Sequence, residues 1–98
     1  MSSLPRFIPP MLCKLGRKAF DSDEHLFEVK WDGTRGLAFC EGGRYRLRNR
    51  RDKDLVPAYP DLDGLARLPS GLVLDGEVVI FKDGKPSFPD MLVREQAR

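Results

Sequence analysis

The sequence contains no run of apolar residues approaching the roughly 20 that a membrane-spanning helix requires. Its first residues also lack the apolar core of a secretory signal peptide. The two cysteines, Cys13 and Cys40, lie far apart and without the spacing of metal ligands. We therefore expect a cytoplasmic protein with two reduced, mostly buried thiols and no membrane partner.

Length and composition restrict the architecture. The 98 residues make one small domain at most, or part of a larger one, and so short a chain has a thin stability margin. Apolar residues make up 41% and charged residues 33%, a balance typical of globular rather than disordered chains. The formal net charge of +2 is too small to indicate a partner by itself.

Positive charge is nevertheless concentrated in one short segment. Between residues 44 and 53 the chain carries many basic side chains and a single acidic one, Asp52. Such a cluster can bind the phosphates of a nucleic acid, whereas a charged sheet edge that resists aggregation explains the pattern equally well. The candidate nucleic-acid contacts are Arg44, Arg46, Arg48 and Arg51.

The first third of the chain has the pattern of an extended lead-in followed by a strand. Its early prolines predict an extended lead-in over residues 1–20. A mix of apolar and β-branched residues predicts a strand over residues 25–30, which ends before the turn signal Asp32-Gly33.

A hairpin is expected next. Residues 34–41 have strand composition, and Gly42-Gly43 is a two-residue turn that leads into strictly alternating residues 44–48. That alternation places three arginines on one face of the strand, with Tyr45 and Leu47 on the other.

The remaining elements complete an α+β unit with a mostly antiparallel sheet and flanking helices. Pro60 is expected to open a helix, because the leucines that follow it share one face. Residues 72–82 end in an apolar run and predict the most interior strand. A turn is expected at residues 83–86, and Ser87 is expected to cap a last helix that runs to the end.

The segment from Glu28 to Arg35 is the best candidate for chemistry. A lysine at a strand end, before an Asp-Gly turn, can project its amine into a cleft, and Lys30 has that position. A lysine nucleophile needs cationic neighbours or desolvation to lose its proton, and Arg35 can supply positive charge and hold phosphate oxygens. The alternative is a hairpin in which Lys30 and Arg35 merely face water while Trp31 packs.

A second candidate is a carboxylate within an apolar strand. Glu77 is surrounded in sequence by apolar residues, and burying an unpartnered carboxylate costs several kcal/mol. Glu77 should therefore face a cleft, a cation or a ligand hydroxyl, although a position on the solvent face of an amphipathic strand fits the alternation too.

These segments together resemble the covalent nucleotidyltransferases, which include DNA ligases, RNA ligases and capping enzymes. The first motif of that superfamily, Lys-x-Asp-Gly-x-Arg, is matched by Lys30, Asp32, Gly33 and Arg35. A later Asp-Gly-Glu motif is matched by residues 75–77. Flanking segments such as Pro9-Pro-Met-Leu12 and Gly84-Lys-Pro-Ser-Phe88 are similar to bacterial ATP-dependent ligases of the end-joining type.

One motif departs from that family. The family usually has Ser-Arg-x-Gly-x-Asp between the two motifs, whereas this chain has Asn49-Arg-Arg-Asp-Lys-Asp54. The arginine, Arg50, and the final aspartate are kept, but the serine and glycine are not.

The resemblance implies a partial nucleotidyltransferase domain over residues 1–98, with the ATP-grasp-like fold of DNA ligases and capping enzymes. It implies ATP and Mg²⁺ as cofactors and nicked or broken double-stranded DNA as partner. Lys30 would attack the α-phosphate of ATP and become lysyl-AMP. The nucleotide would be held by Glu28, Asp32, Gly33, Arg35, Arg50 and Glu77, with Glu77 also the candidate metal ligand.

The resemblance also leads us to expect an incomplete enzyme. The family's later motifs and its oligonucleotide-binding domain have no counterpart in these residues. We therefore expect a truncated or split ligase chain that needs a second chain to supply the missing carboxy-terminal motifs. The alternatives are an inactive ligase remnant, a nucleic-acid-binding fragment that uses its arginines, and an RNA ligase or capping-type enzyme.

Overall fold

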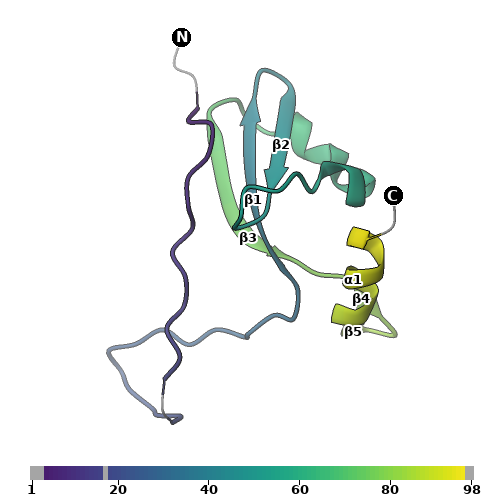
Figure 1. Ribbon diagram of the computed structural model, residues 1–98. Helices are drawn as coiled ribbons and strands as arrows, with labels where there is room; N and C mark the ends of the chain where they lie inside the picture. Colours follow the sequence, from purple (N-terminus) through teal and green to yellow (C-terminus); the bar gives the residue numbers. More distant parts are fainter. Residues whose placement is uncertain (1–3, 17, 97–98) are drawn as a thin grey trace.

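The computed structural model describes residues 4–16 and 18–96 and contains a three-stranded antiparallel sheet with helices on one side (Figure 1). The sheet has the order β2-β1-β3, and a separate two-stranded ribbon pairs β4 with β5. The elements are β1 (Thr34–Glu41), β2 (Arg44–Arg48), η1 (Val56–Ala58), η2 (Pro60–Arg67), β3 (Leu72–Val78), β4 (Phe81–Lys82), β5 (Lys85–Pro86) and α1 (Phe88–Gln96). This arrangement confirms the α+β class with an antiparallel sheet.

The hairpin of β1 and β2 forms as expected. Gly42 and Gly43 have φ angles of 61° and 74°, the left-handed pair that suits the twist of a two-residue hairpin turn. In the resulting register Phe39 faces Arg46 and Ala38 faces Leu47. Because side chains alternate along a strand, even-numbered residues of β1 lie on one face of the sheet and odd-numbered ones on the other.

The face that carries the even-numbered residues of β1 packs the hydrophobic core. It is covered by η1 and η2, which pack partly buried side chains against the sheet, and by α1, which contributes the buried Met91. The buried cluster consists of Ala38, Cys40, Leu47, Leu55, Tyr59 and Met91. The opposite face of the sheet, which carries the odd-numbered side chains of β1, is not covered by these helices.

The lead-in segment crosses that opposite face. Phe7 packs against Phe39 with ring centroids 6.4 Å apart, and Phe39 is 1% exposed. Arg46 lies over the same Phe39 ring at 4.5 Å and donates hydrogen bonds to the carbonyl oxygens of Pro5 and Arg6. Residues 4–7 are thus held on the sheet by β1 and β2.

The strand expected over residues 25–30 is wrong. Those residues form no strand, and Leu26 is 95% exposed. A strand needs a neighbour for its N–H and C=O groups, and both edges of β1 are already occupied by β2 and β3. Within the part of the chain that the structure describes, residues 25–30 have no strand partner.

The expectation for residues 72–82 is also wrong in two respects. The strand ends at Val78, and the chain resumes pairing only in the short β4. It is an edge strand with Leu74 40% exposed, while the most buried strand is β1, whose residues Gly36–Cys40 are all buried. An apolar run marks a strand but does not say how many neighbours it has.

Both expected helices form, but the first of them differs from the expectation in its kind of helix. The segment after Pro60 is a 3-10 helix rather than an α-helix. At the last helix, Ser87 Oγ accepts a hydrogen bond from the Asp90 N–H at 3.4 Å and donates one to Asp90 Oδ2 at 2.7 Å, which confirms the expected cap. The turn at residues 83–86 joins β4 to β5, and residues 97–98 lie outside the described part of α1.

The thiols differ in environment. Cys40 is buried and its pKa is raised by desolvation, whereas Cys13 is exposed, so the expectation of burial is wrong for Cys13. Both are free thiols, as expected. No helix in the described ranges is long and apolar enough to cross a membrane.

Candidate nucleotide-binding site

One open cavity gathers most of the candidate site residues. It has a volume of about 450 Å³ and receives residues from the start of β1, the loop after β2, the end of β3 and the start of α1. We refer to it as the Arg35 cavity. Its lining residues are Gly33, Thr34, Arg35, Asn49, Arg50, Arg51, Glu77 and Phe88. Segments separated by up to about half of the sequence therefore meet at one place, through the pairing of β1 with β2 and β3.

The absence of a side chain at Gly33 allows β1 to approach β3 at this site. A Cβ at Gly33 would stand 2.1 Å from the Val78 carbonyl oxygen, closer than real Cβ atoms come to other atoms. The same close approach lets the Gly33 N–H lower the pKa of the Glu77 carboxylate. Glycine in the Asp-Gly turn is therefore required by the contact with β3.

Arg35 is held by a bidentate ion pair across the sheet. Its Nε donates to Asp75 Oδ1 at 2.6 Å and its Nη2 to Asp75 Oδ2 at 2.7 Å. This pair lowers the pKa of Asp75 and raises that of Arg35, so both stay charged at neutral pH. Asp75 fixes the orientation of the guanidinium and leaves its other N–H groups available for a ligand.

Glu77 lies directly opposite Arg35 in the register of β1 and β3. Neighbouring atoms remove part of its hydration, and this desolvation raises the pKa of Glu77 despite the opposing effects of Arg35 and of the Gly33 N–H. Glu77 is nevertheless exposed to the cavity, which satisfies the expectation that it faces a cleft and a cation.

The lining of this cavity offers one carboxylate, Glu77, to a divalent cation. Within the described residues no three His, Cys, Asp or Glu side chains cluster as a metal site would require. Mg²⁺ is commonly held by one or two carboxylates together with water and the phosphates of a substrate. Glu77, open to the cavity and near Asp32, fits that mode but not an all-protein metal site.

The loop that carries Arg50 is shaped by Asn49 and Asp52. Asn49 Oδ1 accepts hydrogen bonds from the N–H groups of Arg51 and Lys53, both at 2.9 Å. Asp52 has a φ of 62°, the left-handed conformation that the family's glycine adopts readily. Asn49 and Asp52 thus form a turn at the two positions where the family motif has serine and glycine.

The candidate nucleophile lies outside the cavity lining. Lys30 and Glu28 are exposed in the irregular segment that leads into Gly33, and Asp32 lies close enough to influence Glu77. Trp31 of this segment packs edge-on against Phe81 at 6.2 Å. The structure therefore brings together Gly33, Arg35, Arg50 and Glu77 but does not bring Lys30 or Glu28 into the same lining.

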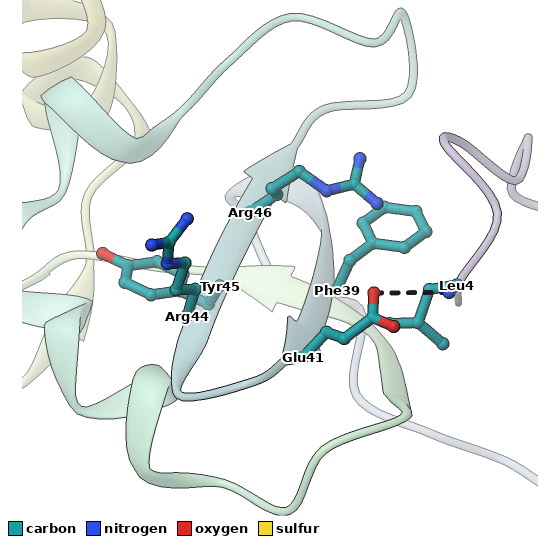
Figure 2. Close-up of a pocket in the computed structure, with 6 residues that line it drawn as sticks. All are labelled: Leu4, Phe39, Glu41, Arg44, Tyr45 and Arg46. Atoms are coloured by element: carbon teal, nitrogen blue, oxygen red, sulfur yellow. Dashed lines mark hydrogen bonds between the residues drawn. The ribbon is translucent and has the colours of Figure 1, made fainter. Parts of the chain in front are cut away.

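The four arginines proposed for nucleic acid fall into two groups. Arg46 donates hydrogen bonds to the lead-in and lies over the Phe39 ring (Figure 2), and Arg48 forms an ion pair with Asp52 at 2.8 Å. Arg44 and Arg51 are exposed, Arg44 beside the shallow hollow drawn in Figure 2 and Arg51 in the Arg35 cavity. Arg51 and the neighbouring Arg50 therefore present positive charge at the cavity, whereas Arg46 and Arg48 stabilise the fold.

Sequence reasoning missed several residues of the cavity. Asp75 was noticed only as part of a motif, although its place two residues before Glu77 puts it on the same face of β3. Asn49 carried a signal, since asparagine favours turns through its own side chain. Thr34 and Phe88 carried none, because their position depends on how α1 packs on the sheet.

Comparisons with known proteins identify relatives of this chain. The family model for the ATP dependent DNA ligase domain matches residues 10–98. The multifunctional non-homologous end joining protein LigD of Mycobacterium bovis is 40% identical over 88 residues, which is 86% of this chain and 12% of that protein. DNA ligase C1 of Mycolicibacterium smegmatis is 42% identical over 78% of this chain and 23% of that protein.

A solved structure is similar as well. The ligase domain of M. tuberculosis LigD superposes with a TM-score of 0.58 at 40% identity, over 67% of this chain and 23% of that one. This chain thus spans about an eighth to a quarter of the length of these relatives. The likeness includes the fold of their nucleotidyltransferase unit. The chain belongs to the family of ATP-dependent DNA ligase domains.

Proposed function

We propose that this chain is the amino-terminal part of an adenylating DNA ligase domain, in which Lys30 accepts AMP from ATP. The observation that carries the proposal is the Arg35 cavity, where Gly33, Arg35, Arg50 and Glu77 meet just after the segment that contains Lys30. ATP is the nucleotide expected, because a solved relative at 43% identity is a mycobacterial DNA ligase D complexed with ATP.

In the proposed reaction the deprotonated Lys30 amine attacks the α-phosphorus of ATP. A phosphorus–nitrogen bond forms, the bond to the bridging oxygen breaks, and pyrophosphate leaves while the proton of the amine passes to solvent. Positive charge near the phosphates is needed for this step, since negative charge shifts onto the leaving group. Arg35, already oriented by Asp75, and the exposed Arg50 supply that charge.

The carboxylates have separate tasks in this proposal. Glu77 would hold the ribose hydroxyl or, with the phosphates, a Mg²⁺ ion that neutralises phosphate charge. Glu28 would contact the adenine and Asp32 would orient the turn that bears Gly33. Because Lys30 and Glu28 lie in an exposed segment, nucleotide binding would have to bring this segment against the cavity.

Incubation with α-labelled ATP and Mg²⁺ tests the proposal. We expect a covalent label on the wild-type chain that is lost in Lys30→Ala. Lys14→Ala is the matched control, since Lys14 is an exposed lysine in the same irregular part of the chain. A label that survives Lys30→Ala would contradict the assignment of Lys30, and the absence of any label would contradict adenylation by this chain alone.

Sealing of nicked or broken double-stranded DNA is the function that we propose for the complete enzyme. The exposed Arg44 and Arg51 are the DNA contacts that this chain would contribute, since Arg46 and Arg48 are engaged within the fold. Each phosphate contact makes binding weaker as salt increases. We expect the double variant Arg44→Ala/Arg51→Ala to reduce the slope of log Kd against log salt, and the matched Arg67→Ala, an exposed arginine at the end of η2, to leave it unchanged.

We further propose that a complementing polypeptide supplies the parts of the relatives that this chain does not match. The chain spans 23% of the solved ligase domain, so a complete catalytic shell needs residues from elsewhere. The purified chain alone should therefore not seal a nick, and sealing by it would overturn this part of the proposal.

A further inference from the structure

The last helix is attached to the first residue of β1 through a single carboxylate oxygen. Glu95 Oε2 accepts a hydrogen bond from Thr34 Oγ1 at 2.6 Å and another from the Tyr59 hydroxyl. Tyr59 is 2% exposed, and burial raises its pKa well above the ordinary value, so it remains a donor at neutral pH. Three elements, α1, η1 and β1, therefore converge on Glu95.

The helix that carries Glu95 is itself held in place. Met91 is fully buried in the core cluster. Arg94 donates to the Ala58 carbonyl oxygen at 2.7 Å, forms an ion pair with Asp61 and lies 5.1 Å from the centre of the Tyr59 ring. The Glu95 carboxylate is thus an acceptor whose position is fixed by the neighbouring turn of α1.

Thr34 lies between Gly33 and Arg35 in the chain, and all three line the Arg35 cavity. Gly33, on one side, packs its backbone against Val78, and Arg35, on the other, lies opposite Glu77. Thr34 also lines the cavity, although its side chain points to the helix-covered face of the sheet. A displacement of Thr34 would therefore move both neighbours relative to the end of β3.

We propose that Glu95 is a positioning residue for the nucleotide site, which acts through the Thr34 hydroxyl to fix the backbone of residues 33–35 against Glu77. This role deepens the proposed function and depends on it for its link to ATP. The geometry itself does not depend on the proposed function, since Glu95 holds Thr34, and Arg35 is paired with Glu77, without a ligand.

Two matched variants separate positioning from stability. Thr34→Val and Tyr59→Phe each remove one hydroxyl that donates to the same Glu95 oxygen, but only Thr34 adjoins Gly33. The first readout is amide hydrogen exchange of residues 33–35 in the free protein, followed by NMR and compared with exchange in β2 as a measure of global opening.

We expect Thr34→Val to speed exchange at residues 33–35 about threefold to tenfold relative to β2, because the backbone there loses its attachment to α1. Glu95→Gln should change exchange in the same direction, since a neutral amide oxygen is a weaker acceptor for the Thr34 hydroxyl. Tyr59→Phe should reduce thermal stability without a selective change at residues 33–35. An unchanged exchange rate in Thr34→Val, or equal selective changes in Thr34→Val and Tyr59→Phe, would overturn the proposal.

The second readout is the KM for ATP in the Lys30-dependent labelling reaction. We expect Thr34→Val to raise KM about threefold to tenfold with little change in kcat, since Arg35 and Glu77 bind the nucleotide in both ground and transition states. If wild type is not labelled, the proposed function fails while hydrogen exchange still decides the positioning role. If labelling occurs and KM is unchanged in Thr34→Val, the link between Glu95 and the nucleotide is refuted.

Discussion

Gly33→Ala perturbs the contact that brings the start of β1 against the end of β3. The added Cβ would stand 2.1 Å from the Val78 carbonyl oxygen and 2.8 Å from Val79 Cγ1. The nearer atom belongs to strand backbone, which cannot move aside as the end of a flexible side chain does. Relief of the overlap must separate the start of β1 from the end of β3.

The size of the effect follows from two opposing contributions. Overpacking of a well-packed site costs about 1–3 kcal/mol, and a clash with backbone belongs at the upper end of that range. Alanine also restricts the unfolded chain, which offsets about 0.4–1 kcal/mol of the cost. The net loss is about 2 kcal/mol, so thermal melting followed by circular dichroism should show Tm lower by about 8–16 °C.

Gly76→Ala is the matched control. Gly76 lies on the partner strand β3, but a Cβ there would have no atom within 4 Å. This variant should melt at the wild-type temperature or slightly above it, because only the unfolded-chain contribution remains. If Gly33→Ala melts with wild type, or if Gly76→Ala melts as low as Gly33→Ala, the steric account of this contact is refuted.

Three further predictions concern the opposite face of the sheet and its adjoining loop. Asp75→Asn should cost about 0.5–1 kcal/mol at neutral pH, because the ion pair with Arg35 is lost. Since the folded-state pKa of Asp75 is lowered, this contribution is complete above the unfolded value of 3.8 and is lost as pH falls through the lower folded-state pKa; pH-dependent melting checks this. Phe7→Ala should lose about 1–2 kcal/mol in urea unfolding through its contact with the buried Phe39, whereas the more exposed Ile8→Ala should lose much less. Asp52→Ala should be about 1 kcal/mol less stable than Asp52→Gly, since both lose the aspartate contacts but only alanine is strained at a φ of 62°; equal unfolding midpoints would contradict this.

Local features of the fold could be predicted because adjacent residues determine them. The Gly42-Gly43 turn and the alternation beyond it fix the β1–β2 hairpin, and Ser87 with Asp90 fixes the start of α1. Residues 25–30 have the composition of a strand but no partner in the described structure, so the prediction failed where strand formation depends on a distant neighbour. The central place of β1 could not be predicted for the same reason.

Pairing across the sheet created the parts of the site that the sequence did not indicate. The motif residues Gly33, Arg35, Arg50 and Glu77 were identified one by one, and strand register then brought them to one cavity. The ion pair between Arg35 and Asp75 spans 40 positions, and no local pattern connects those two residues. Contacts of this kind require the fold before they can be seen.

In the loop after β2, Asn49 and Asp52 replace the serine and glycine of the family motif and still form the turn. Glycine is usual there because the backbone must adopt a positive φ, and aspartate is among the few other residues that tolerate one. Asp52 adopts that conformation and also accepts a hydrogen bond from Arg48 Nε at 2.8 Å, which glycine cannot do. The side chain of Asn49 closes the same turn, so Arg50 reaches the Arg35 cavity without the usual serine and glycine. The turn therefore forms in this chain without the usual serine and glycine, and it is the turn that positions the arginine.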